Sequence, residues 1–197
     1  VRAELEPRSR DEFEIAGYRS ALDDVYARPH EAVTVPRLLH WHRELFRYAG
    51  PDVAGRFNHS ENRVLNPDGS DRFATVPAAV TVDAVSALAD AAEQRLASDS
   101  DHPVLVTAAF TLDLLVIPPF EDGNGRTARI ASNAMLVRSG YVVGRFISVE
   151  QVLNERRTAY YEGLRRSTDG WHSGDHSIWP WAEFFVNVVG DAYRALE

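Results

Sequence analysis

The sequence predicts a mainly α-helical domain that carries one β-hairpin. Apolar residues recur at helical spacing through most of the chain, which indicates a series of amphipathic helices. One of these segments, residues 104–117, is apolar on almost every side, a pattern typical of a helix buried at the centre of a domain. Turn-forming residues interrupt the helical pattern between residues 53 and 78, where a hairpin is expected. We expect residues 1–197 to form a single domain with a core at about residues 14–190.

Two helices are expected before the hairpin. Residues 12–27 place Phe13, Ala21 and Val25 near one face of a helix. Residues 37–48 form the second helix, because proline directly before them suits a first helical turn and Gly50 follows their last apolar residues.

Two short extended runs form the expected hairpin, at about residues 62–65 and 72–75. They flank a stretch rich in Asn, Asp, Gly, Pro and Ser, the residue types that favour turns. With its approaches, the hairpin would occupy about residues 57–76. The same composition is compatible with a plain surface loop, so the residues by themselves leave both interpretations open.

The buried helix at residues 104–117 has one predicted neighbour on each side in the sequence. Thr81 can cap the preceding helix, which continues to about residue 97. The double proline at residues 118–119 ends the buried helix, since proline lacks a backbone N–H and restricts the residue before it. A loop at residues 120–124 then leads into a helix that stops at Gly140.

Two helices complete the domain. Ser148 and Gln151 form a capping box for a helix that continues to about residue 166. Ser177 and Pro180 open the last helix, which is rich in aromatic residues. We expect these aromatic side chains to pack the last helix against the core, with a homodimer surface as the alternative. The cluster consists of Trp171, Trp179, Trp181, Phe184 and Phe185.

Composition excludes several kinds of chemistry. The chain has no Cys, which excludes thiol nucleophiles, cysteine zinc sites, disulfides and iron–sulfur clusters. All 21 basic residues are Arg, so a Schiff-base lysine and a phosphate loop that depends on lysine are excluded as well. The 29 acidic residues give a net charge of −8, which argues against nucleic-acid binding. No apolar run approaches the ~18 residues of a membrane span. The lack of Cys fits a cytoplasmic protein, which we expect.

The stretch from Pro118 to Arg129 has the features of an anion-binding site. Two glycines and an Asn connect the buried helix to the next one, and glycine lets the backbone approach a ligand closely. The first N–H groups of the new helix lack partners within the helix, and the helix dipole adds partial positive charge there. Arg126 and Arg129 share one face of its first turn and can each fork onto phosphate oxygens. Asp122 precedes them, and one carboxylate with phosphate oxygens and waters is a usual way to hold Mg²⁺. The alternative is an ordinary helix start with Asp122 as its capping residue.

This stretch resembles the core motif of the Fic proteins, H-P-F-x-(D/E)-G-N-G-R-x-x-R, and all positions but the first are compatible with it. The resemblance continues through Leu39-His40 in the N-terminal half and Trp171-His172 in the C-terminal half, and it covers about residues 14–190. It implies the Fic (Fido) helical core with a β-hairpin flap over the active site. The named motif positions that match are Pro119, Phe120, Asp122, Gly123, Asn124, Gly125, Arg126 and Arg129.

The resemblance implies a protein adenylyltransferase, an enzyme that moves AMP from ATP onto a Ser, Thr or Tyr hydroxyl of a protein with the help of Mg²⁺. On this chain, Asp122 would hold the metal. Arg126 would contact the phosphates, and Arg129 would face the γ-phosphate. The anion hole around the α- and β-phosphates would be formed by Gly123, Asn124 and Gly125.

The resemblance also implies where the adenine and the target protein would lie. The helix with Tyr160 and Tyr161, together with Asn154, would be near the adenine. The hairpin would bind an extended target segment by strand addition, so that main-chain hydrogen bonds position the target hydroxyl. The hairpin residues expected to take part are Asn62, Arg63, Val64, Phe73, Ala74 and Thr75.

The first motif position departs from the family, because Pro118 stands where Fic proteins have the His that acts as general base. Proline has no titratable group, and loss of a positioned base lowers a reaction rate by ~10²–10⁴-fold. AMP transfer is therefore expected to be impaired or absent. The alternatives are a nucleotide-binding pseudoenzyme that regulates or scaffolds, and a phosphotransferase of the same fold. The residues considered as a substitute base are Glu121, His40, His42, His59, His102, His172 and His176.

Overall fold

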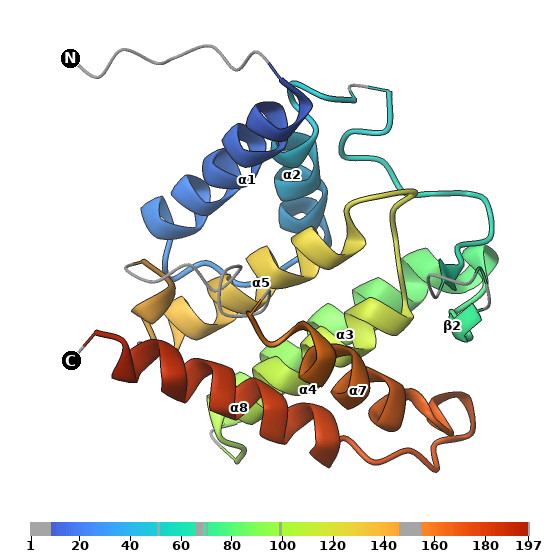
Figure 1. Cartoon of the computed structure of the whole chain (residues 1–197), viewed down its shortest axis with the longest axis vertical. Helices are drawn as coiled ribbons and strands as arrows, with labels where there is room; N and C mark the ends of the chain where they lie inside the picture. The colour runs from blue at the N-terminus through green and yellow to red at the C-terminus, as the bar shows by residue number, and fades with distance from the viewer. Residues whose placement is uncertain are drawn as a thin grey trace.

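The structure is a computed structural model, and it describes residues 9–50, 52–65, 69, 71–98, 100–145 and 155–196. Within these residues the chain forms seven α-helices, two short strands and two 3₁₀ helices (Figure 1). The mainly α-helical class is therefore confirmed. The α-helices are α1 (Arg10–Ala27), α2 (Val35–Leu45), α3 (Ala78–Ser98), α4 (Pro103–Val116), α5 (Asn124–Arg138), α7 (Arg157–Thr168) and α8 (Trp179–Arg194). The strands are β1 (Val64–Leu65) and β2 (Asp71–Phe73), and the 3₁₀ helices are η1 (Val143–Arg145) and η2 (Trp171–Ser173).

Helix α4 forms the centre of the domain. It packs against α3, α5, α7 and α8, and in Figure 1 α5 lies between α4 and the pair α1–α2. Ten of its 14 residues are buried, which confirms the central helix that the sequence predicts. One of its polar side chains is satisfied inside the core, because Thr111 Oγ1 donates to the Thr107 carbonyl at 2.6 Å and lies 2.6 Å from Ser132 Oγ of α5. The central position of α4 fixes where its C-terminal loop emerges.

Helices α1 and α2 pair with each other and pack on α5. The pairing is close because Gly17 of α1 faces the backbone of α2, where a Cβ atom would come within 2.4 Å of the Leu45 carbonyl oxygen. Trp41 of α2 is fully buried, and its Nε1 donates to Asp24 Oδ2 of α1 at 2.8 Å. This packing holds the start of α1 beside the start of α5.

Helix α2 ends at Leu45, three residues before its predicted end at residue 48. The Arg47 N–H donates to the Glu44 carbonyl at 3.3 Å, and the Ala49 N–H donates to the Phe46 carbonyl at 3.2 Å. The chain therefore tightens into hydrogen bonds between residues three apart instead of extending the helix.

The predicted hairpin is present only as two short paired strands in the described residues. β1 and β2 are antiparallel, with Val64 opposite Phe73 and Leu65 opposite Asp71, and their register is irregular. Residues 66–68 and 70 lie outside the described part of the chain, so a continuous hairpin flap over residues 57–76 is not seen. We refer to β1 and β2, together with the flanking residues 62–63 and 74–75, as the ribbon.

The C-terminal half agrees with the prediction where it is described. Helix α7 begins at Arg157, and the predicted capping box at Ser148 and Gln151 lies outside the described residues. Between α7 and α8 the chain forms η2, which the sequence does not predict. Gly170 and Gly174 adopt positive φ angles of 74° and 76° on either side of it, a conformation that favours glycine.

Trp181 and Phe184 pack α8 onto the core as predicted, but Trp179 does not. Trp181 is 1% exposed, and its Nε1 donates to the Ala108 carbonyl of α4 at 2.8 Å. The Tyr160 ring of α7 meets Trp181 edge to face, with ring centroids 5.4 Å apart. Phe184 is also buried, whereas Trp179 is 66% exposed and takes no part in the core. Among the described helices, none combines the length and the apolar character needed to cross a membrane.

Candidate functional site

The loop between α4 and α5 is a closed turn that is held by its own side chains. Pro118, Pro119 and Phe120 are buried. Asn124 Oδ1 accepts from the Phe120 N–H at 2.9 Å, and Asn124 Nδ2 donates to the Phe120 carbonyl at 2.7 Å. The Asn58 N–H donates to the Pro119 carbonyl at 2.8 Å. The side-chain amide of Asn124 therefore closes the turn by bonding both backbone groups of Phe120.

Helix α5 begins without a side-chain cap. Its N-cap residue is Gly123, with a φ angle of 77°, which has no side chain to cap the helix. The Gly123 N–H itself donates to Asp122 Oδ1. A Cβ atom on Gly123 would lie 2.6 Å from Cε2 of Phe46, so the turn requires glycine for its space as well as its conformation. A Cβ atom on Gly125 would lie 3.2 Å from Nη1 of Arg129, which places that guanidinium beside the helix start. The helix start is thus positively polarised and accessible to an anion.

His42 of α2 supports the turn through a hydrogen bond to its backbone. The Gly55 N–H donates to His42 Nδ1 at 2.9 Å, so the other nitrogen, Nε2, carries the proton and donates to the Asp122 carbonyl at 3.0 Å. The ring is fully buried and stacks on Phe120, with ring centroids 3.8 Å apart. Burial lowers the pKa of His42 to about 4, although the hydrogen bond to the Asp122 carbonyl opposes this shift. His42 is therefore a neutral structural residue rather than a substitute base.

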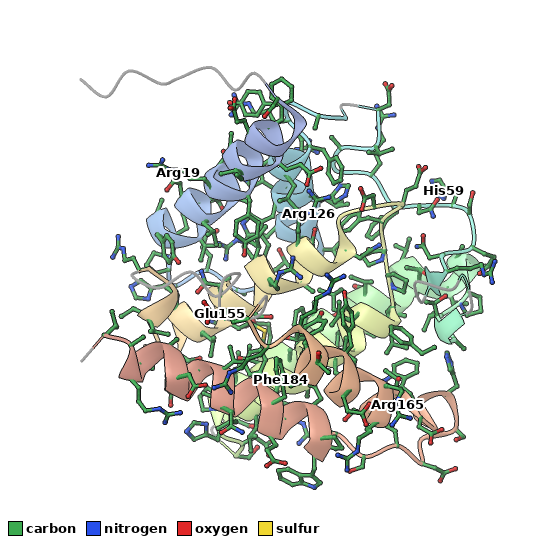
Figure 2. All side chains as sticks on the ribbon, in the orientation of Figure 1. Arg19, His59, Arg126, Glu155, Arg165 and Phe184 are labelled. Atoms are coloured by element: carbon green, nitrogen blue, oxygen red, sulfur yellow. The ribbon has the colours of Figure 1, made fainter. Side chains whose placement is uncertain are left out.

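The charged residues at the turn are linked across three segments. Asp122 Oδ1 accepts from the Gly123 N–H at 2.5 Å, and its Oδ2 lies 3.5 Å from Arg126 Nη2. Arg126 Nη1 donates to Glu14 Oε2 of α1 at 2.9 Å. The guanidinium carbon of Arg126 lies 5.1 Å from the centre of the Phe46 ring. Figure 2 shows Arg126 where α5 approaches α1 and α2.

An open pocket of about 240 Å³ lies at the start of α5, where Asn124, Gly125 and Arg129 line it and Arg126 does not. Its walls come from three parts of the chain that are far apart in sequence: the ribbon, the α4–α5 loop with the start of α5, and α7. Pockets with a few convergent polar groups are the usual place for small-molecule binding. The lining residues are Asn62, Arg63, Phe73, Leu115, Pro118, Glu121, Asn124, Gly125, Arg129, Tyr160, Tyr161 and Leu164.

The base of the ribbon is tied to the end of α4. Asn62 Nδ2 donates to the Pro118 carbonyl at 2.6 Å, and Thr75 Oγ1 donates to the Asn62 carbonyl at 2.7 Å. The Val76 N–H donates to the Val116 carbonyl at 3.0 Å. These bonds hold the two chain segments that enter and leave the ribbon at the edge of the pocket.

The loop after α7 holds the ribbon from its other side. His172 Nε2 lies 2.9 Å from the Ala74 carbonyl, which it can reach as a donor. The adjacent Trp171 is fixed to the core, since its Nε1 donates to Asp113 Oδ1 at 2.7 Å. Burial raises the pKa of Asp113, although this hydrogen bond opposes the shift.

The structure gathers most of the predicted site residues but not all of them. Asp122 is exposed at the rim, Gly123 is buried beneath the helix start, and Arg126 faces α1, so none of the three lines the pocket. Ala74 and Thr75 contribute to the ribbon anchors rather than to the pocket wall. The predicted residues that line the pocket are Asn62, Arg63, Phe73, Pro118, Asn124, Gly125, Arg129, Tyr160 and Tyr161. Val64 forms part of β1 and its side chain is not described, and Asn154 lies outside the described residues.

Several candidates for a substitute base lie away from the pocket. Among the described residues that line it there is no histidine, and Glu121 is its one carboxylate. His59 is exposed on the loop before the ribbon (Figure 2), and His102 accepts from the Val104 N–H at the start of α4. Within the described part of the chain, no three or more His, Asp or Glu side chains are grouped so that they could hold a metal ion.

Sequence reasoning missed the residues that support the site from other helices. Glu14 holds Arg126 from the N-terminal helix, and Leu115 and Leu164 form apolar parts of the pocket wall. Nothing in the local pattern around Glu14 distinguishes it from an exposed helical glutamate. Its partner follows from the packing of α1 on α5, which no short sequence window contains.

Comparison with known proteins identifies the family of this chain. The sequence model of the Fic/DOC family matches residues 32–136, which is more than half of the chain. The chain is 30% identical over 192 residues to the protein adenylyltransferase Fic of Nematostella vectensis, covering 92% of this chain and 40% of that protein. It is 28% identical over 182 residues to the protein adenylyltransferase Fic of Aedes aegypti, covering 86% of this chain and 32% of that protein. The chain thus spans less than half the length of these relatives.

Solved structures share the fold. A Fic family protein from Desulfovibrio desulfuricans G20 superposes with a TM-score of 0.73 at 22% identity, covering 98% of this chain and 55% of that chain. A Fic domain containing signaling protein from Bacteroides thetaiotaomicron gives a TM-score of 0.71 at 21% identity, covering 95% of this chain and 67% of that chain. The helical arrangement around α4 is therefore the Fic-type fold. Taken with the match of the family sequence model over residues 32–136, these findings show that the chain belongs to the Fic/DOC family.

Proposed function

We propose that this protein binds ATP with Mg²⁺ in the pocket between the ribbon, the start of α5 and α7, and that its transfer of AMP to a protein hydroxyl is impaired. The observation that carries the proposal is the composition of the pocket wall. It combines an uncapped helix start and Arg129, which suit a polyphosphate, with Pro118 at the position that the family motif gives to the general base.

The phosphates would bind at the start of α5. The N-cap residue Gly123 gives the first turn of α5 no side-chain cap, and the missing side chain of Gly125 leaves room for close approach. Arg129 lies within reach of the same space and can donate two parallel hydrogen bonds to phosphate oxygens. Arg126 is held by Glu14, so we assign it to the support of Asp122 rather than to the phosphates.

The metal would be held at Asp122. Its carboxylate is 62% exposed at the rim of the turn, and the Gly123 N–H fixes one of its oxygens. A hard cation that keeps several waters fits one carboxylate combined with phosphate oxygens. When bound, Mg²⁺ would neutralise charge on the phosphates during transfer.

The remaining walls would hold the adenine and the target. Tyr160 and Tyr161 offer aromatic surface on the α7 side of the pocket. On the opposite side, the anchored ribbon would act as the flap and receive an extended target segment, with Arg63 and Phe73 facing the pocket. The names of the relatives, protein adenylyltransferases, support AMP as the transferred group.

Pro118 separates two candidate functions. If Glu121 accepts the proton from the attacking hydroxyl, the protein is a slow transferase, since this carboxylate shares the pocket with Arg129. If it does not, the protein is a nucleotide-binding pseudoenzyme. The absence of histidine from the described pocket wall favours the pseudoenzyme.

Intact mass spectrometry after incubation with ATP and Mg²⁺ distinguishes these functions. We expect little added mass on the unchanged chain and an added AMP on Pro118→His, because the substitution restores a base in an otherwise complete pocket. Strong labelling of the unchanged chain would contradict the impaired state. Its loss in Glu121→Gln would then identify the substitute base.

Calorimetry with ATP and Mg²⁺ tests binding separately from transfer. Arg129→Ala should weaken binding by ~1–3 kcal/mol, the scale of hydrogen bonds to a charged group. Arg95→Ala is the matched control, because Arg95 of α3 pairs with Asp101 and does not line the pocket. Equal affinities in the unchanged chain and Arg129→Ala would contradict the assignment of the phosphate site.

A further inference from the structure

Arg126 lies between two carboxylates, one from α1 and the other from the α4–α5 loop. Its Nη1 donates to Glu14 Oε2 at 2.9 Å, and its Nη2 lies 3.5 Å from Asp122 Oδ2. The side chain is 18% exposed, and the Phe46 ring covers one side of its guanidinium. Glu14 is the nearer partner, so the guanidinium is held toward α1.

The contact with Glu14 divides the hydrogen-bonding capacity of Arg126. A guanidinium can place two parallel hydrogen bonds on a single carboxylate. Here one arm is used on α1, and the other reaches Asp122 only at the outer limit of a hydrogen bond. The Asp122 side chain consequently remains 62% exposed while its other oxygen accepts from the Gly123 N–H.

We propose that Glu14 is a positioning residue that keeps Asp122 available to a divalent cation by holding Arg126 on α1. This inference rests on the proposed function, in which Asp122 ligates the metal. Without the charge of Glu14, both arms of Arg126 can turn to Asp122 and cover the oxygen that a cation needs. The positive charge of Arg126 also loses its balancing anion on α1. Both effects lower the affinity of the site for a cation, and neither requires Glu14 to touch the ligand.

The increase in ATP affinity that Mg²⁺ causes measures this role. Calorimetry gives the affinity for ATP in excess Mg²⁺ and in EDTA, for the unchanged chain and for Glu14→Gln. The ratio used below is the affinity in Mg²⁺ divided by the affinity in EDTA. We expect the ratio to fall about tenfold in Glu14→Gln, since loss of a partner behind a metal ligand typically weakens metal affinity ~10–100-fold. The affinity in EDTA should stay the same or increase, because ATP is an anion and Arg126 becomes less neutralised. General damage to the packing of α1 on α5 would lower both affinities together.

Two further variants make the test specific. Glu183→Gln changes the net charge equally at an exposed position on α8, and it should keep the ratio of the unchanged chain. In an Arg126→Gln background, Glu14→Gln should have no further effect on the ratio, because the guanidinium through which Glu14 acts is absent. Thermal melting of each variant verifies that it is folded.

The outcomes that overturn the inference are distinct from those that overturn the proposed function. If Mg²⁺ strongly increases the ATP affinity of the unchanged chain and the ratio is the same in Glu14→Gln, the role of Glu14 is overturned. The proposed nucleotide site is not affected by that result. A lowered ratio that persists when Glu14→Gln is placed on Arg126→Gln overturns the route through Arg126. ATP binding with no gain from Mg²⁺ in the unchanged chain overturns the metal role of Asp122, and the positioning role falls with it.

Discussion

Acidification from pH 7 to pH 5 should destabilise this protein through His42. In the folded state His42 is fully buried, and burial lowers its pKa from the ordinary 6.5 to about 4. In the unfolded state the side chain is hydrated and takes up a proton below pH 6.5. Between these two values the unfolded state binds more protons than the folded state, so the free energy of unfolding falls as the pH falls.

The expected magnitude follows from the two pKa values. A tenfold change in proton affinity corresponds to ~1.4 kcal/mol, so the complete effect is about 3 kcal/mol once the pH falls below 4. At pH 5 about 2 kcal/mol of this is already lost. Protonation would place a second N–H on Nδ1, directly against the N–H of Gly55, so the folded state cannot keep its present hydrogen bonds with a charged ring. The carbonyl of Asp122 would lose its well-oriented donor as the ring moved.

Urea unfolding followed by tryptophan fluorescence measures the effect. The free energy of unfolding is determined at pH 5, 6 and 7 for the unchanged chain and for His42→Gln, which keeps a donor and an acceptor but does not titrate. The difference in the free energy of unfolding between the unchanged chain and His42→Gln should decrease by about 2 kcal/mol from pH 7 to pH 5. His40, whose pKa burial also lowers, is present in both proteins and cancels in the difference.

The control is His59→Gln, because His59 is exposed on a loop. The free energy of unfolding of this variant should depend on pH as that of the unchanged chain does. A constant difference between the unchanged chain and His42→Gln across this pH range would refute the reasoning. It would mean that His42 can accept a proton without leaving its place beneath the turn.

Two other substitutions test the packing around the site. Gly123→Ala should destabilise by more than the ~1–2 kcal/mol of a left-handed residue, since its Cβ would lie 2.6 Å from an aromatic carbon. Gly174→Ala has nearly the same φ angle and no atom within 4 Å, so equal losses in urea unfolding would argue against the contact. Trp171→Phe removes the donor to Asp113 and should cost ~1–3 kcal/mol at pH 7. The cost should be smaller near pH 4, because the pKa of Asp113 is raised by burial and its protonated form needs the indole less. Trp179→Phe, at an exposed position, should change little, and a pH-independent loss in Trp171→Phe would contradict this account.

The turn and the helices around it could be predicted from short stretches of sequence. Because residues 104–117 are apolar on almost every side, they are enough to place α4 at the centre of the domain. The double proline at 118–119 is enough to end the helix. The glycines at 123 and 125 predict a tight turn into an open helix start, which the structure confirms. These features depend on backbone geometry and on apolar periodicity, and both act over a few residues.

The contacts that the sequence did not predict are those of side chains whose partners are distant. Arg126 shares a helix face with Arg129 in the sequence, but it pairs with a glutamate 112 residues away. His42 could serve as a base by its residue type, yet it supports a carbonyl 80 residues away as a neutral ring. Local spacing cannot distinguish such roles, because it contains neither the partner nor the burial.

The sequence by itself determined the helical class, the central helix and the tight glycine turn that leads into α5, because each is encoded by the order of residues along one segment. The tertiary structure alone decided the use of the charged and polar groups. It joined the ribbon to the end of α4 through Asn62, placed Tyr160 opposite the helix start and directed Arg126 toward Glu14. The physical reason is that hydrogen bonds and ion pairs depend on the distance between atoms in the packed core, and packing brings together residues that no local pattern relates.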